Sequence, residues 1–172
     1  FDGFKLGFAS VLPIIQLSNS LGTPIPLSET ILCNYILSEC DIKPPEGMIT
    51  FANVAKNIKI SENKLIGELI SVPYLNLTDK IMFITKINGV EKVVFLENSN
   101  LDMEEKKNFL AEPRFNVNLK DHNIIDIKTF NPKINFNYLG AIIRSVQMIG
   151  SMEKILNLSI DYCSQRKQFG RP

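Results

Sequence analysis

The sequence predicts an α+β protein with N-terminal helices, a central antiparallel β-barrel or sandwich, and a long C-terminal helix that belongs to a helical bundle. Three observations predict this class. Apolar residues recur with helical spacing near both ends of the chain, short strand-like runs fill the middle, and an Asn-Gly pair joins two of these runs. The 172 residues are 45% hydrophobic and 22% charged, which is the composition of an ordinary folded protein.

The N-terminal part predicts two helices. Residues 4–21 carry apolar side chains at helical spacing, and Pro13 within them predicts a kink or an early stop. Residues 22–26 combine glycine and proline and therefore form a loop. We expect Ser28 to cap the second helix, because its hydroxyl can accept a hydrogen bond from the first turn. That helix ends near Glu39, ahead of a proline pair.

The middle of the chain predicts seven strands. They are the runs 48–54, 58–60, 65–70, 81–87, 90–96, 114–119 and 124–129. Asn88-Gly89 is the strongest hairpin signal, because both residues tolerate the positive φ that a tight turn requires. The charged run 103–107 is interpreted as a solvated connection.

A long helix follows from about Asn137. Its apolar stripe advances by three and four residues over about seven turns. One small β domain does not cover a helix of this length, so we expect partner helices from further residues of the chain or from another subunit.

Charge and motifs exclude several classes of function. Nineteen Lys and Arg against 18 Asp and Glu give a net charge of +1, so no charge excess drives non-specific phosphate binding and we expect no nucleic-acid partner. No apolar run reaches the roughly 18 residues of a membrane span. Three widely spaced cysteines are interpreted as free thiols of a cytoplasmic protein. The single histidine, His122, is expected in a surface loop, and we expect no metal site.

The last twelve residues carry the most specific motif. Residues 161–172 read Asp-Tyr-Cys-Ser-Gln-Arg-Lys-Gln-Phe-Gly-Arg-Pro. This run closely resembles the acyl-CoA dehydrogenase family, in which the first long helix of the C-terminal domain ends in Tyr-x-x-x-Arg-x-Gln-Phe-Gly-x-Pro. Residues 21–30, 72–81 and 112–117 resemble other segments of the same family.

The resemblance implies a fragment with three parts. Residues 1–47 would be the end of an N-terminal helical domain, 48–131 a middle β domain, and 132–172 the start of a C-terminal helical domain. It also implies an oxidoreductase of fatty acid and lipid metabolism, in which FAD accepts hydride as the Cα–Cβ bond of an acyl-CoA thioester is oxidised. An electron-transfer flavoprotein would then accept the electrons, and the protein would be a homo- or hetero-oligomer, dimeric or tetrameric.

The same motif implies the cofactor-binding residues. Arg166 would reach the FAD pyrophosphate of the neighbouring subunit, Gln168 would hydrogen-bond the same region, and Phe169 would pack beside it. A guanidinium suits this role because it stays charged and donates paired hydrogen bonds to phosphate oxygens. The family's catalytic carboxylate lies beyond Pro172, so no catalytic residue is assigned within this chain.

Two departures from the family keep alternatives open. Flavin-binding members carry Thr-Glu-Pro early in the middle domain, where residues 49–54 read Ile-Thr-Phe-Ala-Asn-Val. They carry Trp-Ile-Thr-Asn later, where residues 69–74 read Leu-Ile-Ser-Val-Pro-Tyr. The chain is therefore either a flavin-binding dehydrogenase or a non-catalytic partner subunit that completes a neighbour's FAD site. A third interpretation is an unrelated β-barrel binding module with a helical arm.

Overall fold

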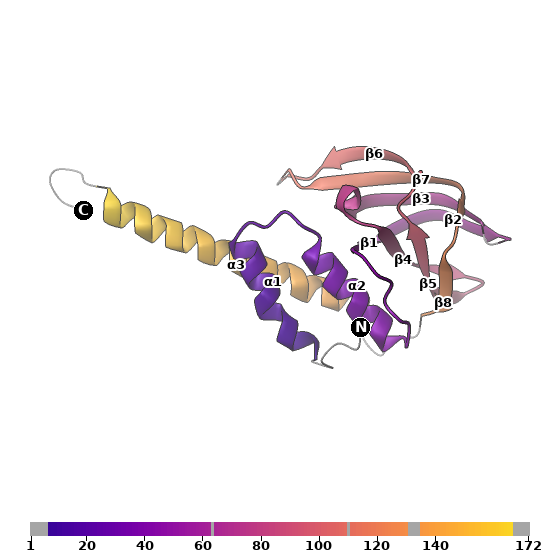
Figure 1. Ribbon diagram of the computed structural model, residues 1–172, viewed down its shortest axis with the longest axis horizontal. Helices are drawn as coiled ribbons and strands as arrows, with labels where there is room; N and C mark the ends of the chain where they lie inside the picture. Colours follow the sequence, from indigo (N-terminus) through magenta and orange to yellow (C-terminus); the bar gives the residue numbers. More distant parts are fainter. Residues whose placement is uncertain (1–6, 63, 110, 131–134, 167–172) are drawn as a thin grey trace. The chain divides into compact units, whose positions relative to one another are not determined.

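The computed structural model describes residues 7–62, 64–109, 111–130 and 135–166. The chain divides into two compact units, one of residues 25–134 and one of residues 1–24 with 135–172 (Figure 1). The division into three domains at 47 and 131 stays a prediction.

Helix α2, Leu27–Glu39, opens the first of these units. Its N-cap is Pro26, so the expectation that Ser28 caps the helix is wrong; Ser28 lies inside the first turn and is buried. The hydroxyl of Thr30 attaches the helix to the following strand. It accepts a hydrogen bond from the Ile49 N–H at 3.2 Å and donates one to the Ile49 carbonyl at 3.0 Å.

Two four-stranded sheets make up the rest of this unit. One has the order β1-β4-β5-β8 and the other the order β2-β3-β7-β6. The strands are β1 (Ile49–Ala52), β2 (Val54–Ser61), β3 (Lys64–Pro73), β4 (Lys80–Ile87), β5 (Val90–Glu97), β6 (Asp102–Lys107), β7 (Pro113–Asn123) and β8 (Asp126–Thr129). The sheets form a sandwich and do not close into a barrel. Pairing is antiparallel except between β1 and β4, which run parallel.

The predicted hairpin is confirmed. Asn88 and Gly89 have φ values of 51° and 80°, and Ile87 pairs with Val90 across the turn. Two consecutive positive φ angles give the turn the twist that matches the two flanking strands.

The interpretation of residues 103–107 as a connection is wrong, because they lie in strand β6. Every residue of β6 is exposed and the strand pairs only with β7, at the edge of its sheet. An edge strand exposed on both faces needs no apolar alternation, and its charges oppose association with other edges. The sequence therefore lacked the pattern by which strands are recognised.

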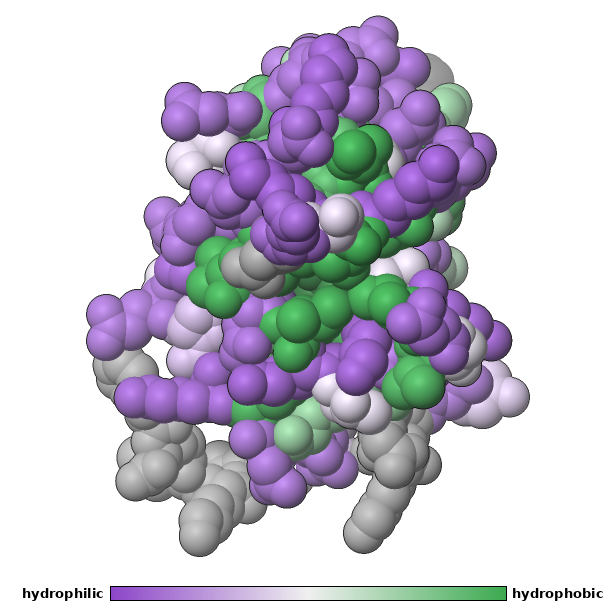
Figure 2. All heavy atoms as spheres, turned by 90° about the vertical axis from the view of Figure 1, so that its right-hand side faces the viewer, coloured by the Kyte–Doolittle hydropathy of each residue, from purple (hydrophilic) through white to green (hydrophobic). Residues whose placement is uncertain are grey.

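The core lies between the sheets, where both contribute fully or nearly fully buried side chains. Phe83 and Leu96 come from one sheet, and Leu69 and Val117 from the other. Each such side chain contributes about 1.5–3 kcal/mol when it leaves water. Hydrophobic residues also come to the surface in the middle of the face seen in Figure 2, with hydrophilic residues around them.

The other unit pairs two helices. A 3-10 turn, η1 (Phe8–Val11), leads into α1 (Leu12–Ser20), and α3 spans Phe136–Gln165. Pro13 lies in the first turn of α1, where its missing N–H costs nothing, so it begins the helix and the expected kink is absent. The 30 residues of α3 extend over about 45 Å. Among the described residues, no helix has the length and apolarity to cross a membrane.

Helices α1 and α3 approach each other closely at Gly150. A Cβ atom at this position would meet the backbone carbonyl oxygen of Gln16 in α1. The side chain of Gln16 also donates a hydrogen bond to Glu153 at 3.0 Å, and Ile15 beside it is fully buried. The absence of a side chain at residue 150 is therefore a condition for this helix pairing.

Gly150→Ala should reduce the free energy of unfolding by about 1–3 kcal/mol, because the new methyl group displaces backbone that cannot yield cheaply. Gly140→Ala is the matched control in the same helix, where a Cβ meets nothing within 4 Å. That change should stabilise by about 0.5–1 kcal/mol through helix propensity. Urea unfolding measures both, and equal effects would contradict the close approach.

Candidate functional site

Arg166 lies at the C-terminal end of α3 and is exposed. Its Nη1 donates a hydrogen bond to the Tyr162 hydroxyl at 2.6 Å, and its Cζ lies 5.4 Å from the centre of the Tyr162 ring. Within the described residues this is the one hydrogen bond of a guanidinium that has five N–H donors. Tyr162 thus orients the guanidinium through a hydrogen bond and a ring contact, while the Arg166 side chain stays exposed.

Tyr162 is the tyrosine of the terminal motif, but no role was assigned to it from the sequence, and its contact with Arg166 was not predicted. The signal was present, because a spacing of four residues places two side chains on the same helix face. Gln168 and Phe169 lie outside the described residues, so their roles stay predictions.

The second half of α3 exposes an unusually large apolar surface. From residue 151 to 166 every residue is exposed. Met152, Ile155, Leu156, Leu158, Ile160 and Tyr162 are each more than half exposed. At 3.6 residues per turn these positions cover more than half of the helix circumference. Such a surface is typical of contacts with other helices or subunits.

The structure brings together the two middle segments in which the family places flavin contacts. Residues 49–54 and 69–74 adjoin, because Val54 pairs with Ile70 and Thr50 donates a hydrogen bond from its hydroxyl to the Pro73 carbonyl at 2.6 Å. Thr50 is fully buried. Its hydroxyl proton is therefore committed to the protein's own backbone.

Backbone donors at the end of β3 are committed in the same way. The Ser71 N–H donates to the Asn116 side-chain oxygen at 3.1 Å, and the Tyr74 N–H donates to the Pro113 carbonyl at 3.2 Å. Pro73 between them has no N–H. The residues present therefore fit only part of FAD: Arg166 suits a pyrophosphate, whereas residues 71, 73 and 74 at the end of β3 offer no free backbone donor.

Tyr74 forms part of a closed polar cluster at this end of β3. Its hydroxyl donates to Glu112 at 3.3 Å, and the same carboxylate accepts hydrogen bonds from Asn108 at 2.6 Å and Arg114 at 2.7 Å. Burial, followed by the negative charges of Glu112 and Glu29, raises the pKa of Tyr74 to about 12. The residue has a left-handed φ of 50°, from which the chain turns into the short 3-10 helix η2, Leu75–Leu77.

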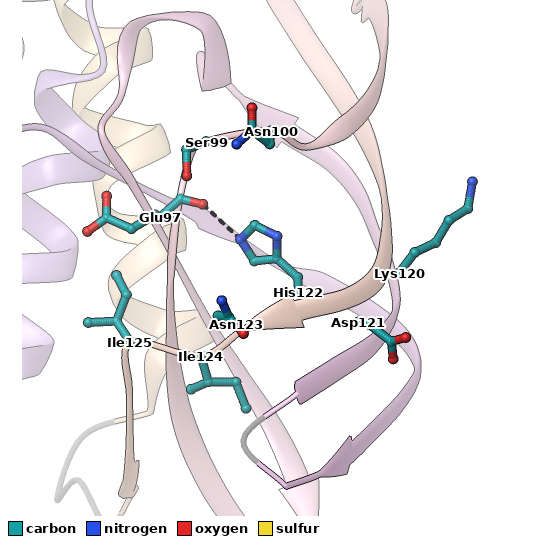
Figure 3. A pocket seen from close by; sticks show the side chains of 9 residues that line it. All are labelled: Glu97, Ser99, Asn100, Lys120, Asp121, His122, Asn123, Ile124 and Ile125. Carbon is teal, nitrogen blue, oxygen red and sulfur yellow. Dashed lines mark hydrogen bonds between the residues drawn. The ribbon is translucent and has the colours of Figure 1, made fainter.

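A polar pocket of about 390 Å³ lies where β7 ends (Figure 3). The expectation of a loop position for His122 is wrong, because it lies in β7. Its Nε2 is 3.2 Å from the Glu97 carbonyl oxygen, which makes Nε2 the donor. In Figure 3 the Asp121 carboxylate and Lys120 ammonium point away from the imidazole, and Lys120 pairs with Asp102 at 2.8 Å. The pocket therefore shows no acid–base pair.

The cysteines and acidic groups add no further centre in the described part of the chain. Cys33, Cys40 and Cys163 form no disulfide among the described residues. Within the ranges that the structure describes, no three His, Cys, Asp or Glu side chains lie close enough to hold a metal ion.

No protein-family model and no curated protein matches the sequence, but solved structures match the fold. The ChsE4–ChsE5 complex from Mycobacterium tuberculosis aligns with a TM-score of 0.80 at 15% identity, over 99% of this chain and 53% of that chain. XiaF from Streptomyces sp. in complex with FADH2 and glycerol aligns with a TM-score of 0.71 at 9% identity, over 98% of this chain and 52% of that chain. A glutaryl-coenzyme A dehydrogenase in its glutaryl-CoA complex aligns with a TM-score of 0.63 at 14% identity, over 94% of this chain and 51% of that chain.

The matched structures include proteins named as acyl-CoA dehydrogenases, such as a putative acyl-CoA dehydrogenase from Mycobacterium smegmatis (TM-score 0.68, 12% identity, over 99% of this chain and 56% of that chain), so the resemblance to this family is confirmed for the fold. The interpretation as an unrelated β-barrel module is wrong, because the shared fold includes the helices as well as the sheets. The chain spans about half the length of the structures it matches.

Tyr74→Phe should flatten the dependence of stability on pH in alkaline solution. The pKa of Tyr74 is above its ordinary value of 10.0, so the stabilisation from the protonated phenol is complete below about pH 10 and is lost as the pH rises toward 12. Urea unfolding at several pH values measures this loss, with Tyr138→Phe as the control at an exposed tyrosine. A loss in the Tyr74 variant as steep as in the unchanged protein would contradict the cluster.

Proposed function

We propose that this chain is part of an FAD-dependent acyl-CoA dehydrogenase and that Arg166 binds the FAD pyrophosphate held by a neighbouring subunit. The observation that carries the proposal is an exposed, partly oriented arginine at the end of α3, within the matching fold. The substrate class is an acyl-CoA thioester, oxidised at the Cα–Cβ bond. FAD, when bound, supplies the hydride acceptor.

Arg166 contributes electrostatic and geometric binding. Its outward N–H groups form charge-assisted hydrogen bonds with pyrophosphate oxygens, which are stronger than those between neutral groups. Tyr162 restrains the guanidinium by one hydrogen bond and by contact with its ring, so less conformational freedom is lost on binding. Gln168 and Phe169 complete the contact in this proposal. The FADH2 complex of XiaF supports a flavin in the shared fold.

The exposed apolar half of α3 supports an assembly. Its surface extends around more than half of the helix, which requires neighbours on two sides. We assign these neighbours to the remaining helices of a C-terminal bundle and to another subunit. The catalytic carboxylate then belongs to that bundle, and no Asp or Glu of this chain takes the role.

The remaining parts of the proposal follow from the class of reaction. Reduced flavin passes its electrons to an electron-transfer flavoprotein, and the pathway is the breakdown of an acyl chain in lipid metabolism. We place the protein in the cytoplasm because its three cysteines, an odd number at wide spacing, do not have the pattern of a disulfide framework.

A second candidate function is a non-catalytic partner subunit that uses Arg166 in the same way. The committed donors of Thr50, Ser71 and Tyr74 favour it, because they close the chain's own half of a flavin site. The two candidates differ in whether the chain's own middle domain binds an isoalloxazine ring and, with it, in whether the chain belongs to a catalytic subunit.

Arg166→Ala should weaken FAD binding to the intact assembly by about ten- to a hundredfold, because one charge-assisted hydrogen bond or more is lost. Tyr162→Phe should weaken it by about two- to tenfold, since the ring contact remains and only the orienting hydrogen bond is removed. Fluorescence titration of the flavin-depleted assembly measures both constants.

Lys154→Ala is the matched control, because it removes another exposed cation from α3 and should leave FAD affinity unchanged. FAD affinity that is the same in Arg166→Ala and in the unchanged protein would overturn the proposed function.

A further inference from the structure

We infer that the sheet unit of this chain does not hold a flavin, and that the FAD reached by Arg166 lies on the middle domain of a different polypeptide with the same fold. This inference rests on the proposed function, because it names the partner of the same site. The partner is an acyl-CoA dehydrogenase-like subunit whose middle strands keep free hydrogen-bond donors.

The first support is the hydrogen bonding of the two middle segments. A flavin ring presents carbonyl oxygens and ring nitrogens that accept hydrogen bonds, so a flavin site needs donors that are unused before binding. The Thr50 hydroxyl is buried and donates to Pro73, and the N–H groups of Ser71 and Tyr74 donate to Asn116 and Pro113. These three donors are therefore already used within the chain and are not available to a flavin.

The second support is the position of strand β3 in its sheet. β3 lies between β2 and β7; its backbone pairs with β2 as far as Ile70, and its last residues, Val72 and Pro73, pair with β7. Its last residue, Pro73, has no N–H, and Tyr74 then turns the chain away into η2. The phenol of Tyr74 points into the Glu112 cluster and is buried there. The N–H groups of Ser71 and Tyr74 and the Tyr74 hydroxyl are therefore all used within the chain.

The third support is charge. Residues 49–54 and 69–74 contain no lysine or arginine, so they supply no cation for a pyrophosphate. Asn53 and Ser71 retain exposed polar side chains, but each is a single neutral group. The cation for the cofactor is Arg166 alone in this assignment, and Arg166 belongs to the other unit of the chain.

These observations favour a different polypeptide, and not a second copy of this chain, as the subunit that holds the flavin. A second copy carries the same closed segments, so a homo-oligomer would bring Arg166 to a middle domain that cannot hold the ring. A different subunit with open donors removes this conflict. The ChsE4–ChsE5 structure shows that the fold occurs in a complex of two named components, and the apolar surface of α3 provides contact area for such a partner.

The experiment places a negative charge on the chain's own middle segments. Asn53→Glu and Ser71→Glu are made in the full chain, and the native assembly is isolated through a tag on this chain. FAD is then titrated by fluorescence. Ser61→Glu is the matched control, because Ser61 is an exposed residue of β2 outside both segments. Circular dichroism confirms that each variant is folded.

The inference predicts that both glutamate variants keep the FAD dissociation constant within about twofold of the control, while Arg166→Ala weakens it by about ten- to a hundredfold. If a flavin lay on residues 49–54 and 69–74, a new carboxylate beside it would repel the cofactor and weaken binding at least about tenfold. That result, with Arg166→Ala still weakened, would overturn the inference and leave the proposed function intact.

Two further outcomes complete the test. Unchanged affinity in Arg166→Ala would overturn the proposed function, and the inference with it. The full chain purified without its partner should bind no FAD at cofactor concentrations that saturate the assembly. One FAD per chain in that homogeneous preparation would overturn the inference even if Arg166 contributes to binding.

Discussion

Hydrogen bonds within the chain use the donors at the end of strand β3, and the assignment of the flavin to another subunit depends on them. Thr50, Ser71 and Tyr74 each use a donor within the sheet unit, and Pro73 has none to use. The buried Thr50 bond stabilises the junction of the two sheets, because a buried donor without a partner costs about 1–3 kcal/mol. In our proposal the same hydrogen bonds use the donors that a flavin would need.

The second half of helix α3, in contrast, is exposed. It carries leucine, isoleucine and methionine side chains that contact water, and an arginine lies at its C-terminal end. Exposed apolar area of this extent is removed from water when a partner binds. Arg166 then emerges from the edge of the buried surface, with Tyr162 holding it in place. The sheet unit uses its donors internally at the end of β3, whereas the exposed apolar surface of α3 in the other unit is suited to contact with a neighbour.

The sequence predicted the order of helices and strands because burial and turn chemistry leave local signals, as at Asn88-Gly89. It did not predict β6, whose charged residues face water on both sides, or the parallel pairing of β1 with β4, which depends on contacts distant in sequence. The motif located Arg166, but its contact with Tyr162 required coordinates. The closure of β3 was unpredictable for the same reason: Asn116 lies 45 residues from the Ser71 N–H that it binds.

The most direct test of this division of roles is an experimental structure of the native assembly with FAD bound. The account predicts the Arg166 guanidinium within hydrogen-bonding distance, about 2.7–3.2 Å, of the pyrophosphate of an FAD whose ring lies on the middle sheet of a different polypeptide. A flavin ring resting on β1 and β3 of this chain, or an Arg166 side chain in bulk solvent away from any cofactor, would contradict it.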